Sequence, residues 1–307
     1  MRTARLVKGG ASLLLAALMG GAAWAQDTET PAATPATEVP TETPVETPAA
    51  AVPDAEATVS HVDCDASPIL AWAPEDMGDL TGMITLCREA YVARFNPQTR
   101  NPDWVVEVLN PENLKGTADR DDAKFQADPD LVRMNVETRA TLPDYKGSGF
   151  DRGHQAPAGD MKRSDEVMME SFYLTNMAPQ VGIGFNRGAW RKLESVVRNW
   201  AATRPGTSLI VITGPIYKDG AEKRFMDSSS GETKVQIPDA FYKIVFDTTR
   251  RRSIAFVLEN KKLDFNAYKE SLTTIQAIQD QTGYNFFPHW SAREATLQET
   301  NVANLWR

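Results

Sequence analysis

Two periods of apolar residues run along this chain, and each predicts a different kind of element. Runs rich in Val, Ile and aromatic residues predict β-strands at residues 84–95, 104–109, 208–214, 234–247 and 253–258. Two shorter strands are expected, one at residues 172–176 and one that ends at His154. The prolines and asparagines of residues 96–102 have the composition of a hairpin loop. We therefore expect sheet to dominate the second half of the chain.

Helical spacing predicts an amphipathic helix in residues 188–200 and another in residues 264–283. The apolar positions of the first are Trp190, Leu193, Val197 and Trp200. Those of the second are Phe265, Tyr268, Leu272, Ile275 and Ile278, between a candidate N-cap at Asp264 and a stop at Gly283. One or two further helical turns are expected at residues 164–170, with Ser164 as N-cap. Residues 113–142 are polar and rich in Asp, which predicts a long surface loop with one short helix at most.

The first 60 residues differ in composition from the rest. Residues 1–25 place three basic residues before a short apolar run and end in Ala23-Trp24-Ala25, which predicts a secretory signal peptide. The apolar run is too short and too interrupted by glycine to favour a membrane anchor, so the alternative is a mitochondrial presequence. Residues 26–60 contain seven acidic residues and no Lys or Arg, and they are rich in Pro and Thr, which predicts a disordered linker. We expect an exported protein, periplasmic or secreted, with no membrane partner.

Residues 61–307 are long enough for one domain with a single buried core. The formal charge is +3 for residues 1–25, −7 for the linker and −4 for the domain, which together give the net −8 of the chain. A mildly acidic domain has no general affinity for polyanions, so any nucleic acid would have to bind a local basic patch. Residues 181–204 contain such a patch, with five Arg or Lys residues and Glu194 as the sole acid.

Both cysteines lie near the start of this domain. Cys64 and Cys87 are an even pair in a chain that we expect to be exported, and such pairs form disulfides in oxidising compartments. A metal or redox role would require further thiols or a histidine at suitable spacing. The sequence therefore favours a structural disulfide.

Residues 151–200 concentrate the residues that carry chemistry. His154, one of three histidines in the chain, lies in Asp151-Arg152-Gly153-His154. Asn176 and Gln180 follow in Asn176-Met177-Ala178-Pro179-Gln180, and Asn186 precedes the helix of residues 188–200. On the polar face of that helix, Arg187, Arg191, Glu194 and Arg198 recur at spacings of three and four. Taken alone, this stripe is more typical of a solvated face with Arg–Glu pairs. A lone histidine such as His154 is more typically a hydrogen-bonded structural residue, and an asparagine before a helix, such as Asn186, is more typically a helix cap.

Considered together, these motifs resemble the DNA/RNA non-specific endonuclease family. The resemblance covers roughly residues 85–290 and rests on three motifs in the same order: Asp-Arg-Gly-His, Asn-Met-Ala-Pro-Gln, and Asn-Arg-Gly-Ala-Trp followed by Leu193-Glu194. It implies an α+β fold with a mixed, mostly antiparallel central sheet flanked by helices. It also implies a ββα-metal motif, in which two strands and the helix of residues 188–200 hold the site.

The resemblance also implies a role for each site residue. His154 is the expected general base, Asn186 the direct ligand of Mg²⁺ or alternatively Mn²⁺, and Glu194 a carboxylate that holds a metal-bound water. Arg152 and Arg198 are expected to stabilise the transition state, together with Arg120, whose spacing matches the family less closely. Asn176 and Gln180 are expected to orient the loop and the metal waters. Arg187 and Arg191 are expected to contact nucleic acid.

The predicted activity is metal-dependent hydrolysis of DNA and RNA, single or double stranded, and the resemblance implies 5′-phosphate products. Weak base preference is expected because no motif reads base edges. Members of the family are often dimers, so a homodimer is one expectation. Two alternatives remain: a phosphodiesterase of the same fold that acts on nucleotides, and an exported nucleic-acid-binding protein without catalytic activity. Activity on a small chromogenic diester without DNA cleavage would indicate the first. Binding that is indifferent to Mg²⁺ would indicate the second.

Overall fold

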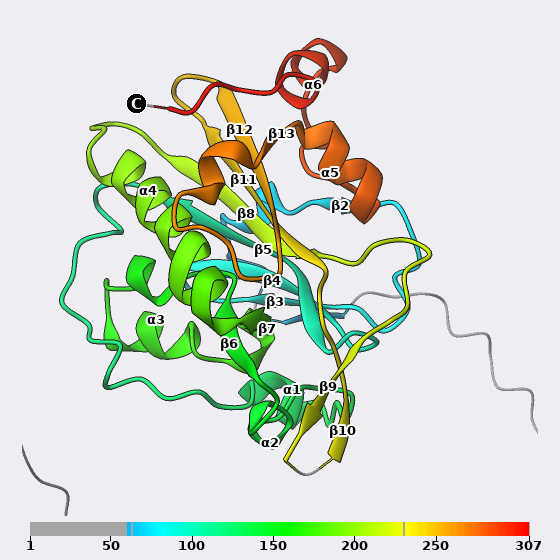
Figure 1. Ribbon diagram of the computed structural model, residues 1–307. Helices are drawn as coiled ribbons and strands as arrows, with labels where there is room; N and C mark the ends of the chain where they lie inside the picture. The colour runs from blue at the N-terminus through cyan, green and yellow to red at the C-terminus, as the bar shows by residue number, and fades with distance from the viewer. Residues whose placement is uncertain (1–59, 63, 230, 307) are drawn as a thin grey trace, which may run out of the picture. The chain divides into compact units, whose positions relative to one another are not determined.

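The computed structural model describes residues 60–62, 64–229 and 231–306 (Figure 1). The predicted signal peptide and nearly all of the predicted linker lie outside these residues. Ser60, the last residue of the predicted linker, begins the first strand. Within the described residues, no helix is both long and apolar enough to span a membrane.

A central sheet of eight strands in the described part of the chain organises the fold (Figure 1). Its order is β1-β3-β4-β5-β8-β11-β12-β13, and every neighbouring pair is antiparallel except β1 with β3. The strands are β1 (Ser60–Val62), β3 (Ile84–Cys87), β4 (Tyr91–Asn96), β5 (Asn101–Leu109), β8 (Leu209–Ile216), β11 (Ala240–Asp247), β12 (Arg252–Glu259) and β13 (Leu272–Thr273). The predicted fold class, α+β with a mixed and mostly antiparallel sheet, is confirmed.

Three smaller strand pairs and several helices surround this sheet. The pairs are β2 (Glu75–Asp76) with β14 (Tyr284–Asn285), β6 (Phe150–His154) with β7 (Met177–Val181), and β9 (Phe225–Ser228) with β10 (Gly231–Gln236). The α-helices are α1 (Pro129–Arg133), α2 (Leu142–Tyr145), α3 (Asp165–Glu170), α4 (Arg191–Ala202), α5 (Ile275–Thr282) and α6 (Ala292–Glu299). Shorter helical turns are η1 (Leu70–Trp72), η2 (Ala158–Asp160), η3 (Leu174–Asn176) and η5 (Ala267–Glu270), and η4 (Gly182–Trp190) is an irregular helical segment that leads into α4.

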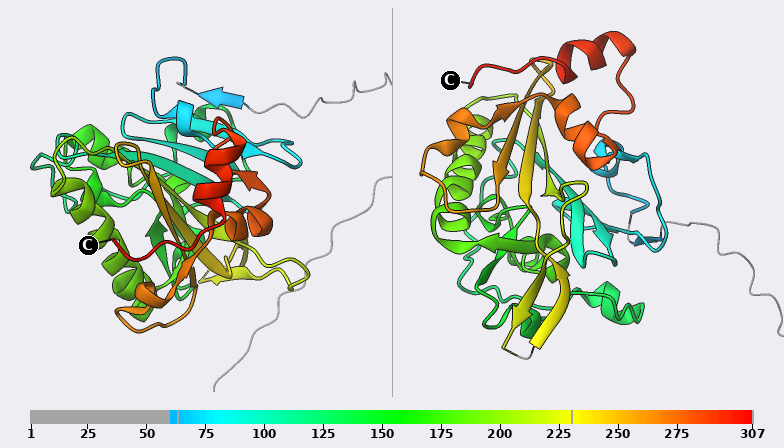
Figure 2. Two further views of the ribbon diagram at one scale, coloured as in Figure 1. Left: turned by 90° about the horizontal axis from the view of Figure 1, so that it is seen from above. Right: turned by 45° about the vertical axis from the view of Figure 1, so that its right-hand side comes forward.

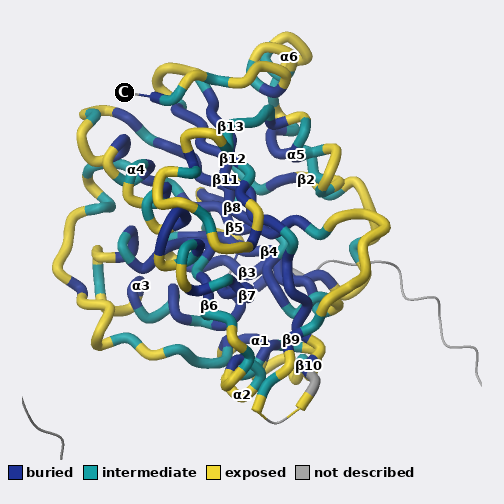
Figure 3. Tube along the Cα trace, in the orientation of Figure 1, coloured by how far each residue is buried: buried dark blue, intermediate teal, exposed yellow. Residues whose placement is uncertain are grey.

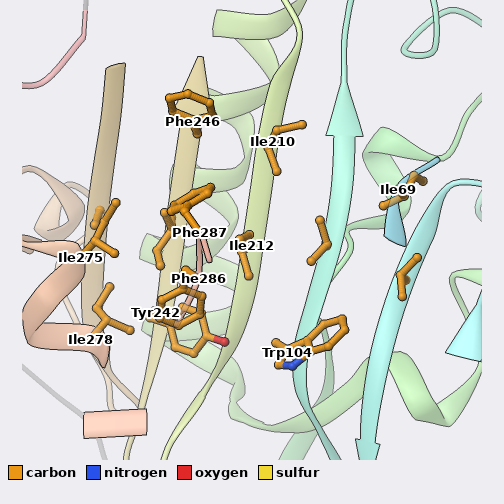
Figure 4. Packing of buried hydrophobic residues seen from close by; sticks show 14 of the residues in the cluster. Ile69, Trp104, Ile210, Ile212, Tyr242, Phe246, Ile275, Ile278, Phe286 and Phe287 are labelled. Carbon is orange, nitrogen blue, oxygen red and sulfur yellow. The ribbon is translucent and has the colours of Figure 1, made fainter. Parts of the chain in front are cut away.

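Helices cover the two faces of the sheet, and the strands between them are buried (Figures 2 and 3). On one face, alternate residues of β8 and β11 pack against Trp190, Leu193 and Val197. On the other face, the intervening residues of the same strands pack against α5 and the Phe286-Phe287 segment. Figure 4 shows part of this second cluster, with Ile275 and Ile278 of α5 beside the side chains of β11. The period of two along each strand thus supplies two separate apolar layers.

The predicted helix of residues 188–200 forms with the expected buried stripe. Trp190, Leu193, Val197 and Trp200 are all buried. The regular helix α4 begins at Arg191 and not at Gly188, because Gly188 has the non-helical backbone angles φ −129° and ψ −110°. The predicted start is therefore three residues too early. The helix of residues 164–170 is confirmed as α3, where the Ser164 hydroxyl accepts a hydrogen bond from the Val167 amide.

Two of the predicted strands are in fact two strands each. Residues 84–95 form β3 and β4, because the chain turns at Arg88, whose buried guanidinium pairs with Asp128 at 2.7 Å and with Asp130 at 2.6 Å. Residues 234–247 fall in β10 and β11, which are separated around Pro238, a residue that cannot donate a hydrogen bond to a neighbouring strand. The strands at residues 104–109, 208–214 and 253–258 lie within β5, β8 and β12 as predicted.

Two further predictions are wrong. Residues 172–176 were predicted to form a strand, but they contain the turn η3, and the strand β7 begins only after it. The side chain of Asn176 forms hydrogen bonds with the backbone of Ala156, and such bonds favour a turn over pairing as a strand. Residues 264–283 are not one helix but η5, β13 and the short helix α5. Thr274, not Asp264, caps α5 by accepting a bond from the Ala277 amide, while Gly283 ends it in the left-handed conformation as expected.

The predicted disulfide between Cys64 and Cys87 is present and joins the segment after β1 to the end of β3. It closes a loop with a sequence separation of 23 residues. Both sulfurs belong to the apolar cluster that includes Trp104 and Ile210. The bond therefore ties the entry segment to the core of the sheet.

Replacing both cysteines tests the contribution of this bond. We expect Cys64→Ala/Cys87→Ala to lower the free energy of unfolding by about 3 kcal/mol, because the unfolded chain regains the freedom that the closed loop removes. Guanidinium denaturation followed by tryptophan fluorescence measures this difference. Wild-type protein unfolded with a reductant present should match the variant. An unchanged unfolding midpoint in both cases would contradict the prediction.

Candidate active site

The strands β6 and β7 pair in antiparallel register and are followed by η4 and α4, which gives the expected ββα layout (Figure 1). His154 lies opposite Met177, Gly153 opposite Ala178, and Asp151 opposite Gln180. A Cβ atom on Gly153 would lie only 2.1 Å from Cδ of Gln180. Glycine is therefore required for the two strands to approach this closely.

A cavity of about 580 Å³ lies between β6 and α4. It brings together eight of the residues singled out from the sequence, namely Arg120, Arg152, His154, Asn186, Arg187, Arg191, Glu194 and Arg198. The polar face of the predicted helix thus lines this cavity. Asn176 and Gln180 do not line the cavity and lie buried behind β6.

His154 is held between two aromatic rings. The centre of its ring lies 5.6 Å from that of Phe125 and 4.9 Å from that of Phe172, which meets it edge-on. Burial, together with the positive charge of Arg120, lowers the pKa of His154 to about 3. Its Nε2 atom has no hydrogen-bond partner among the described residues. The imidazole is therefore neutral at neutral pH and has a free nitrogen that can accept a hydrogen bond from water, although a pKa this low makes it a weaker base than an ordinary histidine.

Four of the five arginines that line the cavity fall into two groups, and the fifth is Arg191. Arg198 pairs with the buried carboxylate of Asp160, and Nε of Arg187 lies 2.9 Å from Oδ2 of Asp151. Arg120 and Arg152 have no carboxylate partner in the described part of the chain and instead lie over Phe172 and Phe125, at 5.7 Å and 4.4 Å from the ring centres. These two guanidinium groups keep their charge available for a phosphate.

Asn186 and Glu194 offer oxygen atoms to the same cavity. Nδ2 of Asn186 donates to Oδ2 of Asp151 at 2.8 Å, which fixes the amide, and no described residue donates to its Oδ1. Glu194 is half-buried and makes no ion pair or hydrogen bond with the described residues; burial raises the pKa of this carboxyl to about 7. The residues described here include no group of three His, Cys, Asp or Glu side chains that could enclose a metal. One amide oxygen and one unpaired carboxylate fit a cation that keeps most of its waters, as Mg²⁺ does.

Asn176 fixes the segment that follows His154. Its Oδ1 accepts from the Ala156 amide at 2.9 Å, and its Nδ2 donates to the carbonyls of Ala156 and Ser171 at 2.9 Å and 2.8 Å. The Gln180 amide packs against Gly153 and has no hydrogen-bond partner among the described residues. Both residues therefore lie where they contact the backbone of the His154 segment.

Several residues around the site were not singled out from the sequence as site residues. The aromatic rings of Phe125 and Phe172 come from a loop and a turn, and that of Tyr145 comes from the four-residue helix α2. Beneath α4, Glu107 and Lys243 are buried on the face of the sheet toward the cavity, and Nζ of Lys243 donates to Thr213 Oγ1 at 2.5 Å. Glu107 and Lys243 could have been found in the sequence, because each is a charged residue within an otherwise apolar strand. Desolvation lowers the pKa of Lys243 and raises that of Glu107.

Comparison with known proteins agrees with this geometry. Residues 77–293, more than half of the chain, match the model of the DNA/RNA non-specific endonuclease family. The chain is 37% identical over 212 residues to Nuclease C1 of Cunninghamella echinulata var. echinulata, which covers 65% of this chain and 81% of that protein. It is 36% identical to the mitochondrial endonuclease G of Homo sapiens, over 69% of this chain and 72% of the relative. A solved complex of EndoG with EndoGI aligns with a TM-score of 0.60 and 28% identity, over 68% of this chain and 88% of that one.

The close approach of Gly153 to Gln180 gives a first prediction for the site. We expect Gly153→Ala to lower the free energy of unfolding by about 1–3 kcal/mol, because the added methyl overlaps the Gln180 side chain. Gly153→Ala/Gln180→Ala removes the overlapping atoms and should recover part of the loss. Gly78→Ala is the matched control, since nothing lies within 4 Å of its added methyl. Chemical denaturation of the four proteins tests this, and equal stability of Gly153→Ala and Gly78→Ala would contradict it.

The raised pKa of Glu194 gives a second prediction. Because the folded pKa of about 7 exceeds its ordinary value of 4.5, the folded protein binds the proton more tightly, and this contribution to stability is lost as the pH rises through 7. In metal-free buffer, the melting temperature of Glu194→Gln minus that of wild type should therefore increase as the pH is raised from 5 to 8. Melting curves in EDTA measure the difference, with Glu112→Gln as an exposed control. A difference that does not change with pH would be the contrary result.

Proposed function

Since this chain belongs to the DNA/RNA non-specific endonuclease family and is therefore a nuclease, we propose that it cleaves internal phosphodiester bonds of both DNA and RNA in the cavity between β6 and α4. One observation carries the proposal. The neutral, unpartnered imidazole of His154 shares a single cavity with the free oxygen of Asn186, the unpaired carboxylate of Glu194 and five arginines. A protein that only binds nucleic acid has no need of a base and a cation site in one place.

In this mechanism His154 accepts a proton from a water molecule as that water attacks phosphorus. The P–O3′ bond breaks, so the products carry a 5′-phosphate and a 3′-hydroxyl. Arg152 and Arg120, which have no carboxylate partner among the described residues, stabilise the negative charge that grows on the phosphate oxygens. Arg198 adds a third guanidinium, which its ion pair with Asp160 holds in place.

We infer that Asn186 and Glu194 hold a divalent cation, Mg²⁺ or alternatively Mn²⁺. Asn186 would be the direct ligand through Oδ1, and Glu194 would accept hydrogen bonds from water molecules bound to the ion. When bound, the cation stabilises negative charge on the leaving oxygen. Asp151 acts on Asn186 and not on His154, because its carboxylate accepts from the Asn186 amide and pairs with Arg187.

Recognition would use the backbone of the nucleic acid. Arg187 and Arg191 line the cavity beside the reacting groups and are placed to contact flanking phosphates. The domain is acidic as a whole, so the affinity for nucleic acid would come from this local patch and would fall as salt rises. The predicted signal peptide supports export, so the proposed setting of the activity is the periplasm or the exterior of the cell.

Substitution of the base and of the metal ligand tests the mechanism. We expect wild-type protein to degrade plasmid DNA and RNA with Mg²⁺ and to be inactive in EDTA. His154→Ala should lose a factor of about 10²–10⁴ in kcat, because no other neutral imidazole lies in the cavity. Asn186→Ala should require far more Mg²⁺, whereas Asn186→Asp keeps an oxygen ligand and should bind the ion more tightly than Asn186→Ala.

Two exposed residues outside the cavity supply the controls. His289→Ala and Asn301→Ala remove the same side chains at sites remote from the reacting groups, so both should cut like wild type. Initial rates on plasmid and on RNA are compared for all five variants. Cleavage by His154→Ala at the wild-type rate, or full activity in EDTA, would overturn the mechanism.

A further inference from the structure

A second cavity, of about 850 Å³, adjoins the catalytic one. Four residues line both cavities: Arg120, Phe125, Tyr145 and Arg152. Beyond these shared residues, the second cavity extends between residues 121–124 and the helix α2. The two cavities therefore meet at these four residues.

The lining of the second cavity combines cations with apolar and aromatic surface. Lys124 and Lys146 are exposed and lie in its wall, and Asp121 is the one acidic residue among those that line it. Leu142 and Pro143 of α2 are also exposed there, and the rings of Phe125, Tyr145 and Phe172 complete the lining. Phosphate contact alone would require only the lysines. The apolar and aromatic surface fits the face of a nucleobase.

Tyr145 lines both cavities and has a hydroxyl that no described residue uses. Its side chain is only 4% exposed, yet its hydroxyl has no hydrogen-bond partner among the described residues. A buried hydroxyl without a partner loses the bonds that it would make to water in the unfolded chain. Burial also raises the pKa of Tyr145, so the phenol stays protonated and remains able to donate. Because Tyr145 lines both cavities, its hydroxyl is a candidate donor to a ligand bound there.

We propose that the second cavity is a subsite for an unpaired nucleotide next to the cleaved bond. The base packs against Phe125 and the apolar surface of α2, Lys124 and Lys146 hold the adjoining phosphate, and Tyr145 donates to the nucleotide. This inference rests on the proposed nuclease function and narrows its substrate. In a duplex the base is paired and stacked inside the helix and is not available to the subsite, so the protein should prefer single-stranded DNA and RNA.

Binding, measured without cleavage, tests the subsite. In the His154→Ala background with Mg²⁺, a fluorescein-labelled oligothymidylate and a labelled DNA duplex of equal length are titrated by fluorescence anisotropy. We expect the single strand to bind more tightly. Adding Lys124→Ala and Lys146→Ala should weaken binding of the single strand by about tenfold or more and of the duplex by less than about threefold. Adding Tyr145→Phe, which removes only the hydroxyl, should also weaken binding of the single strand selectively.

Salt dependence separates a phosphate contact from a change in folding. Loss of both lysines should reduce the slope of log Kd against log salt by about 0.7 for the single strand, because the one phosphate that they hold contributes about 0.7. Lys124→Arg/Lys146→Arg should restore the slope. Lys115→Ala/Lys269→Ala is the matched control, since both lysines are exposed and line neither cavity.

The outcomes distinguish this inference from the proposed function. The subsite would be overturned if His154→Ala binds the single strand and the duplex with equal affinity. It would also be overturned if Lys124→Ala and Lys146→Ala weaken binding of the single strand and of the duplex by the same factor, even if plasmid cleavage is intact. If wild-type protein cleaves neither polymer, the proposed function fails, while the binding assay still decides whether the subsite exists. An unchanged salt slope in the lysine variant would also count against the subsite.

Discussion

The antiparallel pairing of β6 with β7 is the constraint on which the rest of the site depends. Its register places His154 opposite Met177 and Asp151 opposite Gln180. Asp151 in turn fixes the amide of Asn186, so the position of the candidate metal ligand is set from the strand that carries the candidate base. Glu194 and Arg198 are placed independently, because burial of Trp190 and Leu193 on the sheet fixes the rotation of α4. The pairing of β6 with β7 and the packing of α4 therefore each position part of the same cavity.

The charges of the cavity explain how an acidic domain can hold a polyanion. Asp160 and Asp151 neutralise Arg198 and Arg187, while Arg120 and Arg152 lie on aromatic rings without a carboxylate partner among the described residues. The net charge of −4 for the domain is thus compatible with a local excess of positive charge at the site. Aromatic neighbours keep the two guanidinium groups in place without cancelling their charge.

Periodic features could be predicted from the sequence, and features that depend on tertiary contacts could not. Arg191, Glu194 and Arg198 share one face of α4 as their spacing predicted, because one buried stripe fixes the opposite face; a role of that face in the site was implied by the family resemblance and not by the spacing. The turn between β3 and β4 depends on Arg88 pairing with Asp128 and Asp130, some forty residues away, which no local pattern reveals. The apolar spacing after Asp264 predicted one helix, yet Phe265 is exposed and Leu272 pairs with Phe256 as a strand. Tyr145 belongs to a helix of four residues, which is too short to show a period.

Phe125 connects the chemistry of the site to its recognition of substrate. Its ring contacts both the His154 imidazole and the Arg152 guanidinium, and it lines both cavities. A base that packs against this ring from the second cavity would exclude water from one side of His154 and Arg152. The electrostatic interaction of Arg152 with the phosphate would then strengthen, because water screens it less. Binding of an unpaired flanking nucleotide would thereby favour cleavage of the neighbouring bond, so that the single-strand preference would appear in kcat as well as in affinity.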